Sequence, residues 1–303
     1  MGEYSKRVGE IGEEVISDFL KLIGWKNPRL NFDIPSVDPE KHEKKTNGID
    51  GFFHYESPMI TNTIENIIFS IKFSSKDYKS NPVPQFKEYY IDLAKAIESF
   101  KKSDIRTSAM NKHSNIESIF DRGILFWINN TTDRTALNGK LIKIEIPKGY
   151  NHDGIILMDN SRIEFIFDSI NFIKNKYREA DIEFSYFSTS MNNDDPNTRN
   201  GNVLPFQYMS SNILPFRIQD KNTSKVTLAV CTRDNFDDDE LMKIMGLAHK
   251  LGNNFQSSTD IYFPDFNKLN NEQTVETIKQ AFDDNDFTEN LKIGNYNSSF
   301  LNQ

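Results

Sequence analysis

The order of helical and extended segments in the first half of the chain is the feature that most limits its fold. Residues 9–23 predict an amphipathic helix, and Pro82 and Pro84 open a second predicted helix over 84–102. Apolar segments predict strands at 49–55, 65–73 and 123–129. The order helix, strand, strand, helix, strand predicts an α/β fold, with a mixed sheet flanked by helices.

The second half of the chain predicts a further α/β region. An alternating strand at 141–146 (LIKIEI) is predicted at the end of the first half. The strands predicted after it are 155–158, 162–167, 182–187, 226–232 (VTLAVCT) and 260–263 (DIYF). The predicted helices are 169–178, 237–251 and 272–282. A polar loop is predicted at 191–202. We therefore divide the chain into a first domain, 1–150, and a C-terminal α/β region of unknown role, 151–303.

Composition narrows the class of protein. The single cysteine, Cys231, excludes an intrachain disulfide and a cysteine-rich zinc site. Acidic residues interrupt the first 20 residues, so no signal peptide is predicted. No segment approaches the roughly 18 apolar residues that a membrane-spanning helix needs. We therefore expect a soluble protein of the cytoplasm, with no membrane partner.

Charge is unevenly distributed along the chain. The net charge is −8, which argues against a simple nucleic-acid binder. Residues 66–112 are nevertheless locally basic, whereas residues 234–240 are strongly acidic. A phosphate-bearing partner is expected to prefer the first half, with Lys76, Lys79 and Lys101 among its contacts. The acidic segment instead suits a protein partner.

Two acidic residues stand out as candidate metal ligands. Glu13 lies at the edge of the apolar face of the first predicted helix, where a carboxylate needs a partner, a proton or a metal. Its neighbour Glu14 faces solvent. Asp50 opens a predicted strand within the segment NGIDG, where the flanking glycines shield the carboxylate little. Taken singly, Glu13 is also explained as a helix-boundary residue, and Asp50 as a turn aspartate.

A lysine and a pair of helical residues complete the pattern. In IIFSIKFS at 67–74, alternation puts Ser70 and Lys72 on one face of the strand. A lysine in so apolar a strand requires an anion, a cleft or an exposed edge. On the second predicted helix, Gln85 and Tyr89 lie one turn apart on one flank, so both can face a neighbouring site. A solvated glutamine and a half-buried tyrosine would explain that pair equally well.

Taken in this order, the four elements resemble the RecB-like and lambda-exonuclease-like branch of the PD-(D/E)xK nucleases, over roughly residues 9–130. The resemblance implies a restriction-endonuclease-like fold and hydrolysis of DNA with Mg²⁺ or Mn²⁺, RNA not being excluded. It implies that Asp50 is the central metal ligand, Glu13 a second metal-associated carboxylate and Lys72 the catalytic lysine. Gln85 and Tyr89 then correspond to the helix motif that supports the site and the phosphate backbone.

One position departs from the family pattern. The family usually places Asp or Glu two residues before the lysine, where this chain has Ser70. Some members with serine there recruit a carboxylate from another element, and Glu13 is the better replacement because Glu88 points away on its helix. The backbone carbonyl of Ile71 is a further candidate ligand for Mg²⁺, which prefers hard oxygen ligands.

Three functions remain open from the sequence. The first is an active metal-dependent deoxyribonuclease, with a role in restriction or defence against phage. The second is a nuclease-like subunit without hydrolysis that binds nucleic acid or a partner protein, which Ser70 and the acidic second half favour. The third is a structural α/β protein in which the motifs coincide by chance. Formation of a homo-oligomer, the choice of DNA or RNA and the mode of cleavage also stay open.

Overall fold

The chain folds into two compact units, Met1–Glu164 and Phe165–Gln303, and most residue contacts lie within one unit or the other. The computed structural model describes residues 3–131, 136–187, 199–252 and 256–297. The boundary predicted from the sequence, after residue 150, lies 14 residues before Glu164. In the described part of the chain, no helix combines the length and the apolar character needed to cross a membrane.

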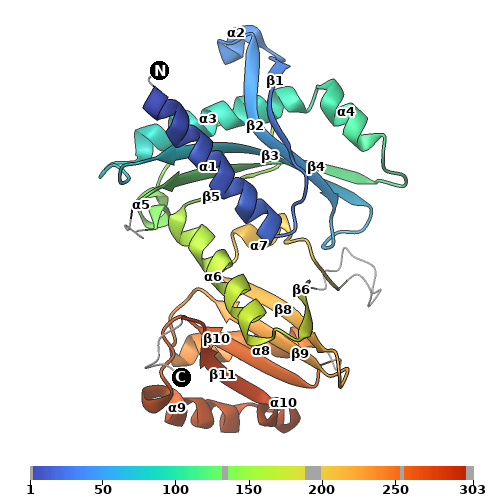
Figure 1. Ribbon diagram of the computed structural model, residues 1–303, viewed down its shortest axis with the longest axis vertical. Helices are drawn as coiled ribbons and strands as arrows, with labels where there is room; N and C mark the ends of the chain where they lie inside the picture. Colours follow the sequence, from blue (N-terminus) through green and yellow to red (C-terminus); the bar gives the residue numbers. More distant parts are fainter. Residues whose placement is uncertain (1–2, 132–135, 188–198, 253–255, 298–303) are drawn as a thin grey trace. The chain divides into compact units, whose positions relative to one another are not determined.

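The first unit is built on a five-stranded sheet (Figure 1). Its strands, in spatial order, are β1 (Arg29–Pro35), β2 (Thr46–Glu56), β3 (Thr63–Ser74), β4 (Ser118–Asn129) and β5 (Ile155–Met158). β2 is antiparallel to β1 and β3, whereas β4 is parallel to β3 and β5. The sequence prediction is confirmed here, because segments 49–55, 65–73 and 123–129 lie in one mixed sheet.

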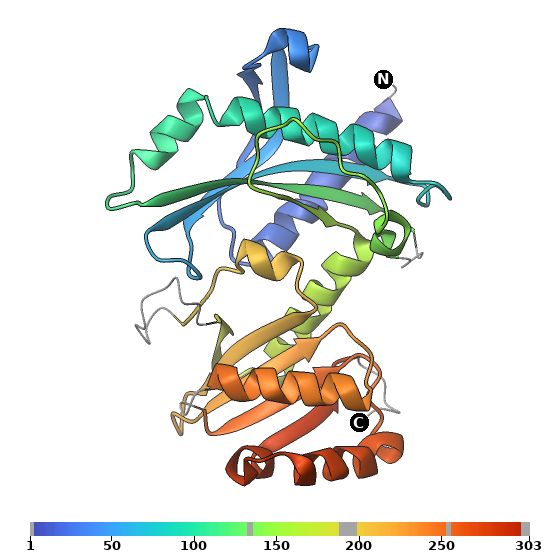
Figure 2. The same cartoon turned by 180° about the vertical axis from the view of Figure 1, so that it is seen from behind.

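Helices cover both faces of this sheet. α1 (Glu3–Leu22) lies on one face and α3 (Val83–Phe100) on the other, as the opposite views of Figures 1 and 2 show. The shorter helices are α2 (Pro39–His42), α4 (Asp104–Met110) and α5 (Leu137–Leu141), and α6 (Asn160–Lys176) begins in this unit. The restriction-endonuclease-like arrangement of a mixed sheet between helices is therefore present.

α1 packs closely on the sheet. The predicted apolar stripe is buried, with exposed fractions of 0–4% at Ile16, Phe19, Leu20 and Ile23. A Cβ atom added at Gly12 would lie 2.5 Å from Cβ of Phe73, so only a glycine permits the helix to approach β3 this closely. This approach places the next residue, Glu13, beside the sheet.

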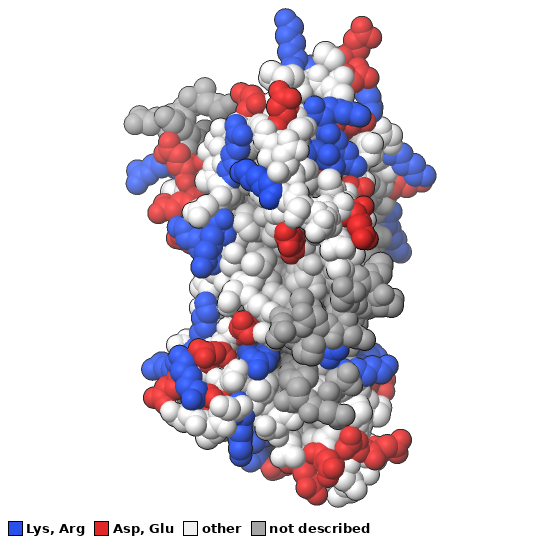
Figure 3. All heavy atoms as spheres, turned by 90° about the vertical axis from the view of Figure 1, so that its right-hand side faces the viewer, with Lys and Arg blue, Asp and Glu red and all other residues white. Residues whose placement is uncertain are grey.

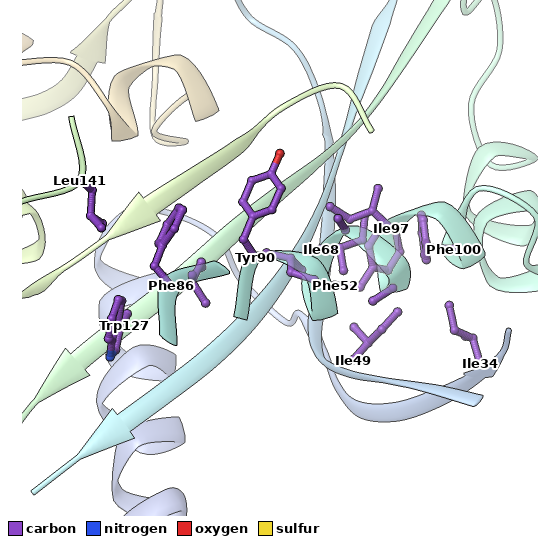
Figure 4. Close-up of a cluster of buried hydrophobic side chains, with 14 of the residues drawn as sticks. Ile34, Ile49, Phe52, Ile68, Phe86, Tyr90, Ile97, Phe100, Trp127 and Leu141 are labelled. Carbon is purple, nitrogen blue, oxygen red and sulfur yellow. The ribbon is translucent and has the colours of Figure 1, made fainter. Parts of the chain in front are cut away.

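A continuous apolar core fixes α3 to the other face of the sheet (Figure 4). Phe100 at the end of α3 is fully buried, and its ring centre lies 4.6 Å from that of Phe52 on β2. Burial of one such side chain contributes about 1.5–3 kcal/mol to folding. α3 is therefore held firmly, and side chains on its flank keep a defined position relative to β3.

Tyr90, a residue of this core, contacts His152, and the hydrogen bonds of that histidine depend on its protonation. The hydroxyl of Tyr90 lies 2.9 Å from Nε2 of His152, and the backbone N–H of Gly154 donates to Nδ1 of His152 at 3.2 Å. Because Nδ1 accepts a hydrogen bond, the neutral ring protonated on Nε2 satisfies both contacts. Burial and the nearby Lys101 lower the pKa of His152, whereas Asp153 acts in the opposite sense.

We expect the free energy of unfolding to fall as the pH drops from about 7.5 to about 5.5, partly through His152. The pKa of His152 is lower in the folded chain than its ordinary value of 6.5, so the unfolded chain binds more protons in this range. The contribution of His152 to stability is fully present above its unfolded pKa. It is lost as the pH falls from that value through the lower pKa of the folded chain. Urea unfolding at both pH values measures it, and His152→Gln should reduce the difference. An undiminished difference in that variant would contradict the assignment.

The second unit has a six-stranded sheet and a core of its own. Its strands, in spatial order, are β11 (Leu291–Asn295), β10 (Ser258–Phe263), β9 (Val226–Thr232), β8 (Ile213–Asp220), β6 (Ala180–Ser185) and β7 (Asn200–Gly201). Its helices are α7 (Phe206–Met209), α8 (Asp238–Gly252), α9 (Lys268–Ala281) and α10 (Asn285–Glu289). β9, β10 and β11 are parallel, and apolar side chains of α8 and α9 pack on β9 and β10. The second α/β region is thus confirmed.

Three local predictions were wrong. Segment 141–146 is not a strand: α5 ends at Leu141, Ile142 and Ile146 are exposed, and only Ile144 of the alternating isoleucines packs against the core. Segment 162–167 belongs to α6, because buried Ile166, Ile170 and Ile173 follow helical spacing, and a short apolar run does not distinguish the two structures. Within the predicted loop 191–202, the pair Asn200–Gly201 forms β7, and residues 191–198 lie outside the described part.

Candidate functional site

Asp50 lies where β2 separates from β3. The paired register of the two strands ends at Gly51 and Phe69. Beyond it, Oδ2 of Asp50 accepts hydrogen bonds from the backbone N–H of Ile71 at 2.6 Å and from Oγ of Ser70 at 3.1 Å. The carboxylate thus takes the place of a backbone partner for β3. Its position is therefore fixed by the strand next to it.

The glycine after Asp50 is required by packing. A Cβ atom on Gly51 would lie 2.0 Å from ring atoms of Phe69, so no other residue fits without a shift of that ring. Neither Gly51 nor Gly48 has a positive φ. The alternative explanation of Asp50 as a turn aspartate is therefore wrong, because Asp50 lies within β2.

Lys72 lies two residues after Ser70 on β3 and faces α3. Its Nζ lies 5.4 Å from the ring centre of Tyr89, within the range of a cation–π contact. Gln85 donates from Nε2 to the hydroxyl of Tyr89 at 2.5 Å, and the ring of Tyr89 packs edge-on against Trp127. In the described residues, Lys72 has no carboxylate within ion-pair distance. The structure thus brings together the predicted lysine and the predicted Gln and Tyr pair.

One pocket joins these elements. It has a volume of about 230 Å³, and its lining includes Asp50, Ser70 and Lys72 together with Lys44 and Asp92. We call it the Asp50–Lys72 pocket. Adjacent strands β2 and β3 supply the three predicted residues, and α3 covers them. An amine without a carboxylate partner and a carboxylate with one oxygen held in place thus face the same space.

Glu13 lies outside the lining of this pocket. Its Oε2 accepts a hydrogen bond from Nδ2 of Asn31 at 2.9 Å. In the β1–β2 register, Asn31 lies between the pairs Leu30–Gly51 and Phe32–Ile49, which places it across from Asp50. Glu13 is thus linked to the strand position beside Asp50, but its carboxylate does not line the pocket as that of Asp50 does.

Three residues of this region were missed by sequence reasoning. Asn31 has a φ of 48°, a left-handed conformation inside a strand that the sequence did not predict. Lys44 and Asp92 form an ion pair of 2.8 Å at the Asp50–Lys72 pocket. Asp92 follows Tyr89 by three residues on α3, so helical spacing was the signal that would have found it. Asn31 and Lys44 gave no such signal.

Comparison with known families is decisive for the first unit. The family model described as the GAPS4 protein PD-(D/E)XK nuclease domain matches residues 1–162. The chain belongs to this family. Its PD-(D/E)XK domain covers the whole five-stranded sheet, so the predicted superfamily is confirmed, whereas the RecB-like and lambda-exonuclease-like branch stays a prediction. No curated protein and no solved structure matches the chain.

The oxygen atoms of this PD-(D/E)XK domain suit a hard divalent cation. Oδ1 of Asp50 accepts no hydrogen bond from the described residues, whereas Oδ2 is held by Ser70 and Ile71. Mg²⁺ binds such carboxylates with few protein ligands and keeps several waters. Among the described residues, no group of three His, Cys, Asp or Glu side chains is gathered closely enough to hold a metal. A cation here would therefore rely on few carboxylates.

Proposed function

We propose that the PD-(D/E)XK domain is a deoxyribonuclease that hydrolyses phosphodiester bonds with the help of Mg²⁺ or Mn²⁺. The observation that carries the proposal is the Asp50–Lys72 pocket, in which the carboxylate of Asp50 and the amine of Lys72 come from adjacent strands and the amine has no carboxylate partner among the described residues. Family membership supports nuclease chemistry in this domain. The metal and the DNA substrate are part of the proposal.

Asp50 is proposed as the central residue for the metal, with Glu13 as a second carboxylate and the backbone carbonyl of Ile71 as a further ligand. When bound, the cation polarises the phosphate and helps generate hydroxide. The hydrogen bonds from Ser70 and Ile71 to Oδ2 orient the carboxylate of Asp50 and leave Oδ1 available. Pre-orientation of this kind lowers the free energy needed to assemble the site.

Lys72 is proposed as the catalytic lysine. Its charge is held against the face of Tyr89 rather than by a carboxylate, so it is not neutralised before a phosphate arrives. There it stabilises negative charge that develops on the phosphate, or positions the attacking water. Gln85 holds the hydroxyl of Tyr89 and so fixes the ring that orients the lysine.

The purified chain tests this proposal directly. Linear, circular and single-stranded DNA, and RNA, are incubated with Mg²⁺, with Mn²⁺ or with EDTA. We expect cleavage of DNA that EDTA abolishes. Cleavage of circular DNA would identify an endonuclease, and cleavage of RNA alone would correct the substrate. Absence of cleavage under every condition would overturn the catalytic proposal.

A second candidate function is a nuclease-like subunit that binds nucleic acid or a partner protein without hydrolysis. Ser70 favours it, since a hydroxyl that donates to Asp50 replaces the usual second carboxylate. The acidic start of α8 (Asp238, Asp239 and Glu240) is the proposed contact for a protein partner. Under either function, we propose a role in restriction or antiviral defence inside the cytoplasm. A homo-oligomer is an outcome that light scattering of the purified chain would reveal.

Glu13→Gln is expected to weaken Mn²⁺ binding and to lower the cleavage rate by about tenfold, since loss of a supporting carboxylate removes one charged ligand. Isothermal titration with Mn²⁺ and a cleavage time course measure the two effects. The matched control is Glu14→Gln, which changes the exposed neighbour and should be silent. If Asp92→Asn shows the loss and Glu13→Gln does not, the supporting carboxylate is the one that lines the pocket.

A further inference from the structure

Some Lys and Arg side chains of the first unit already form ion pairs within the chain and are therefore less available to a ligand. Nζ of Lys101 lies 3.2 Å from Oδ2 of Asp153 and donates to Asn151 at 2.9 Å. Arg106 is paired with Asp121. These two members of the basic stretch are therefore occupied by contacts within the chain. Lys101, expected from the sequence to contact nucleic acid, is a poor choice for that contact.

Three other cations line one groove. A groove of about 440 Å³, near the start of β1, is lined by Lys26, Arg29 and Lys112, all of them exposed. We call it the basic groove. In the described part of the chain, none of these three side chains forms an ion pair. Among the described residues that line the groove, Asp104 is the one acidic residue. The groove therefore carries an excess of uncompensated positive charge.

Apolar and aromatic residues, among them Phe52 and Ala109, form part of the wall, together with the polar Asn27 and Ser108. His54 stacks on Phe52 with ring centres 5.6 Å apart, and its Nδ1 lies 3.2 Å from Nε2 of His113. Burial, followed by His113 and Lys112, lowers the pKa of His54. A wall of low polarity strengthens the attraction of these cations for an anion.

The charge pattern of one face of the molecule shows no large basic patch. On the face drawn in Figure 3, basic and acidic side chains are interspersed and form no single large patch. The basic groove is identified from ion pairs instead. Cations that contact a carboxylate are excluded, and cations that share one groove and have no such partner among the described residues are retained.

We propose that the basic groove binds phosphates of the nucleic-acid strand that enters the Asp50–Lys72 pocket. His54 lies four residues after Asp50 on β2, and four strand residues span roughly 13 Å. Arg29 is paired in register with Phe52 on the same strand. Since successive phosphates of one DNA strand advance about 3.4 Å along the helix axis, the groove is a few nucleotides from the cleavage site. This inference rests on the proposed function.

The test compares two triple variants of equal charge change. The groove variant is Lys26→Glu, Arg29→Glu and Lys112→Glu, and the control variant is Lys174→Glu, Lys250→Glu and Lys292→Glu, which are exposed residues of the second unit. Anisotropy of a labelled DNA of about 20 base pairs is measured in EDTA, so binding is separated from cleavage. Circular dichroism confirms that both variants are folded.

We expect the groove variant to bind at least about tenfold more weakly than the control variant, with a smaller dependence of affinity on salt. Each lost phosphate contact reduces the slope of log K against log salt by about 0.9 for duplex DNA. Equal affinities of the two variants would overturn the proposal. Loss of binding of inorganic phosphate or a free mononucleotide, with unchanged DNA binding, would overturn it in favour of a small anionic ligand.

The two proposals fail in different ways. If the wild-type chain cleaves no substrate but binds DNA through the groove, the catalytic proposal fails and the groove stands. If the wild-type chain cleaves DNA and the groove variant binds and cleaves equally well, only the groove proposal fails. The neutral variant Lys26→Gln, Arg29→Gln and Lys112→Gln should fall between wild type and the charge reversal, because it removes attraction without adding repulsion.

Discussion

Replacement of Lys72 by alanine is expected to lower the rate of DNA cleavage by about 10²–10³-fold or more, with little change in DNA affinity. The amine is proposed to act on charge that develops in the transition state, so its loss appears in turnover rather than in binding. Lys72 is half-buried and has no carboxylate partner among the described residues, so its removal leaves no acidic group unpaired. Single-turnover cleavage and anisotropy in EDTA measure the two quantities separately.

The companion change is Asp50→Asn, which should remove activity and also weaken Mn²⁺ binding. An asparagine keeps an oxygen that can accept the N–H of Ile71, so the end of β3 should stay in place while the negative charge is lost. Glu88→Gln is the control, because that side chain is exposed on α3 and should be silent. Cleavage that persists in both Lys72→Ala and Asp50→Asn would place the active site elsewhere.

The sequence predicted the central strands because their burial leaves a simple pattern. β3 and β4 carry continuous apolar runs, and a lysine inside such a run pointed to a site at Lys72. β1 was not predicted although its apolar residues Leu30, Phe32 and Ile34 alternate with other residues, since five of its seven residues are exposed and only Ile34 is buried. α1 begins at Glu3, six residues before the predicted start. The sequence did not predict its first turns because they are polar and carry no apolar stripe.

The sequence predicted residues of the candidate site only where they are near neighbours on one strand or one helix. Ser70 and Lys72 share a strand, and Gln85 and Tyr89 share a helix, so periodicity was enough to group each pair. The hydrogen bond from Asn31 to Glu13 depends instead on a left-handed residue within β1 and on the pairing of β1 with β2.

The same limit applies to ion pairs between distant segments. Lys44 and Asp92 are separated by 48 residues in the sequence and meet only because α3 crosses the sheet beside the start of β2. Neither residue type nor spacing marks such a pair in advance. The basic groove was hidden for the same reason, since the ion pairs of the described residues had to be known before the cations outside those pairs could be recognised.

Arg106→Ala is expected to lower the free energy of unfolding by about 3–5 kcal/mol, because it leaves a buried carboxylate without its cation. Asp121 on β4 is 1% exposed. Its carboxylate accepts hydrogen bonds from Nε of Arg106 at 3.0 and 3.1 Å and from Nδ2 of Asn66 at 2.8 Å, and Nη2 of Arg106 lies 2.9 Å away. Urea denaturation at neutral pH measures the loss.

A second substitution separates the unpaired charge from lost packing. Asp121→Asn in the Arg106→Ala background removes the negative charge and keeps a hydrogen-bonding side chain, so this double variant should be more stable than Arg106→Ala alone. Lys79→Ala, at an exposed cation, should change stability by less than about 0.5 kcal/mol. If the double variant is no more stable than the single one, Arg106 stabilises the fold through its packing between α4 and β4 and not by neutralising Asp121.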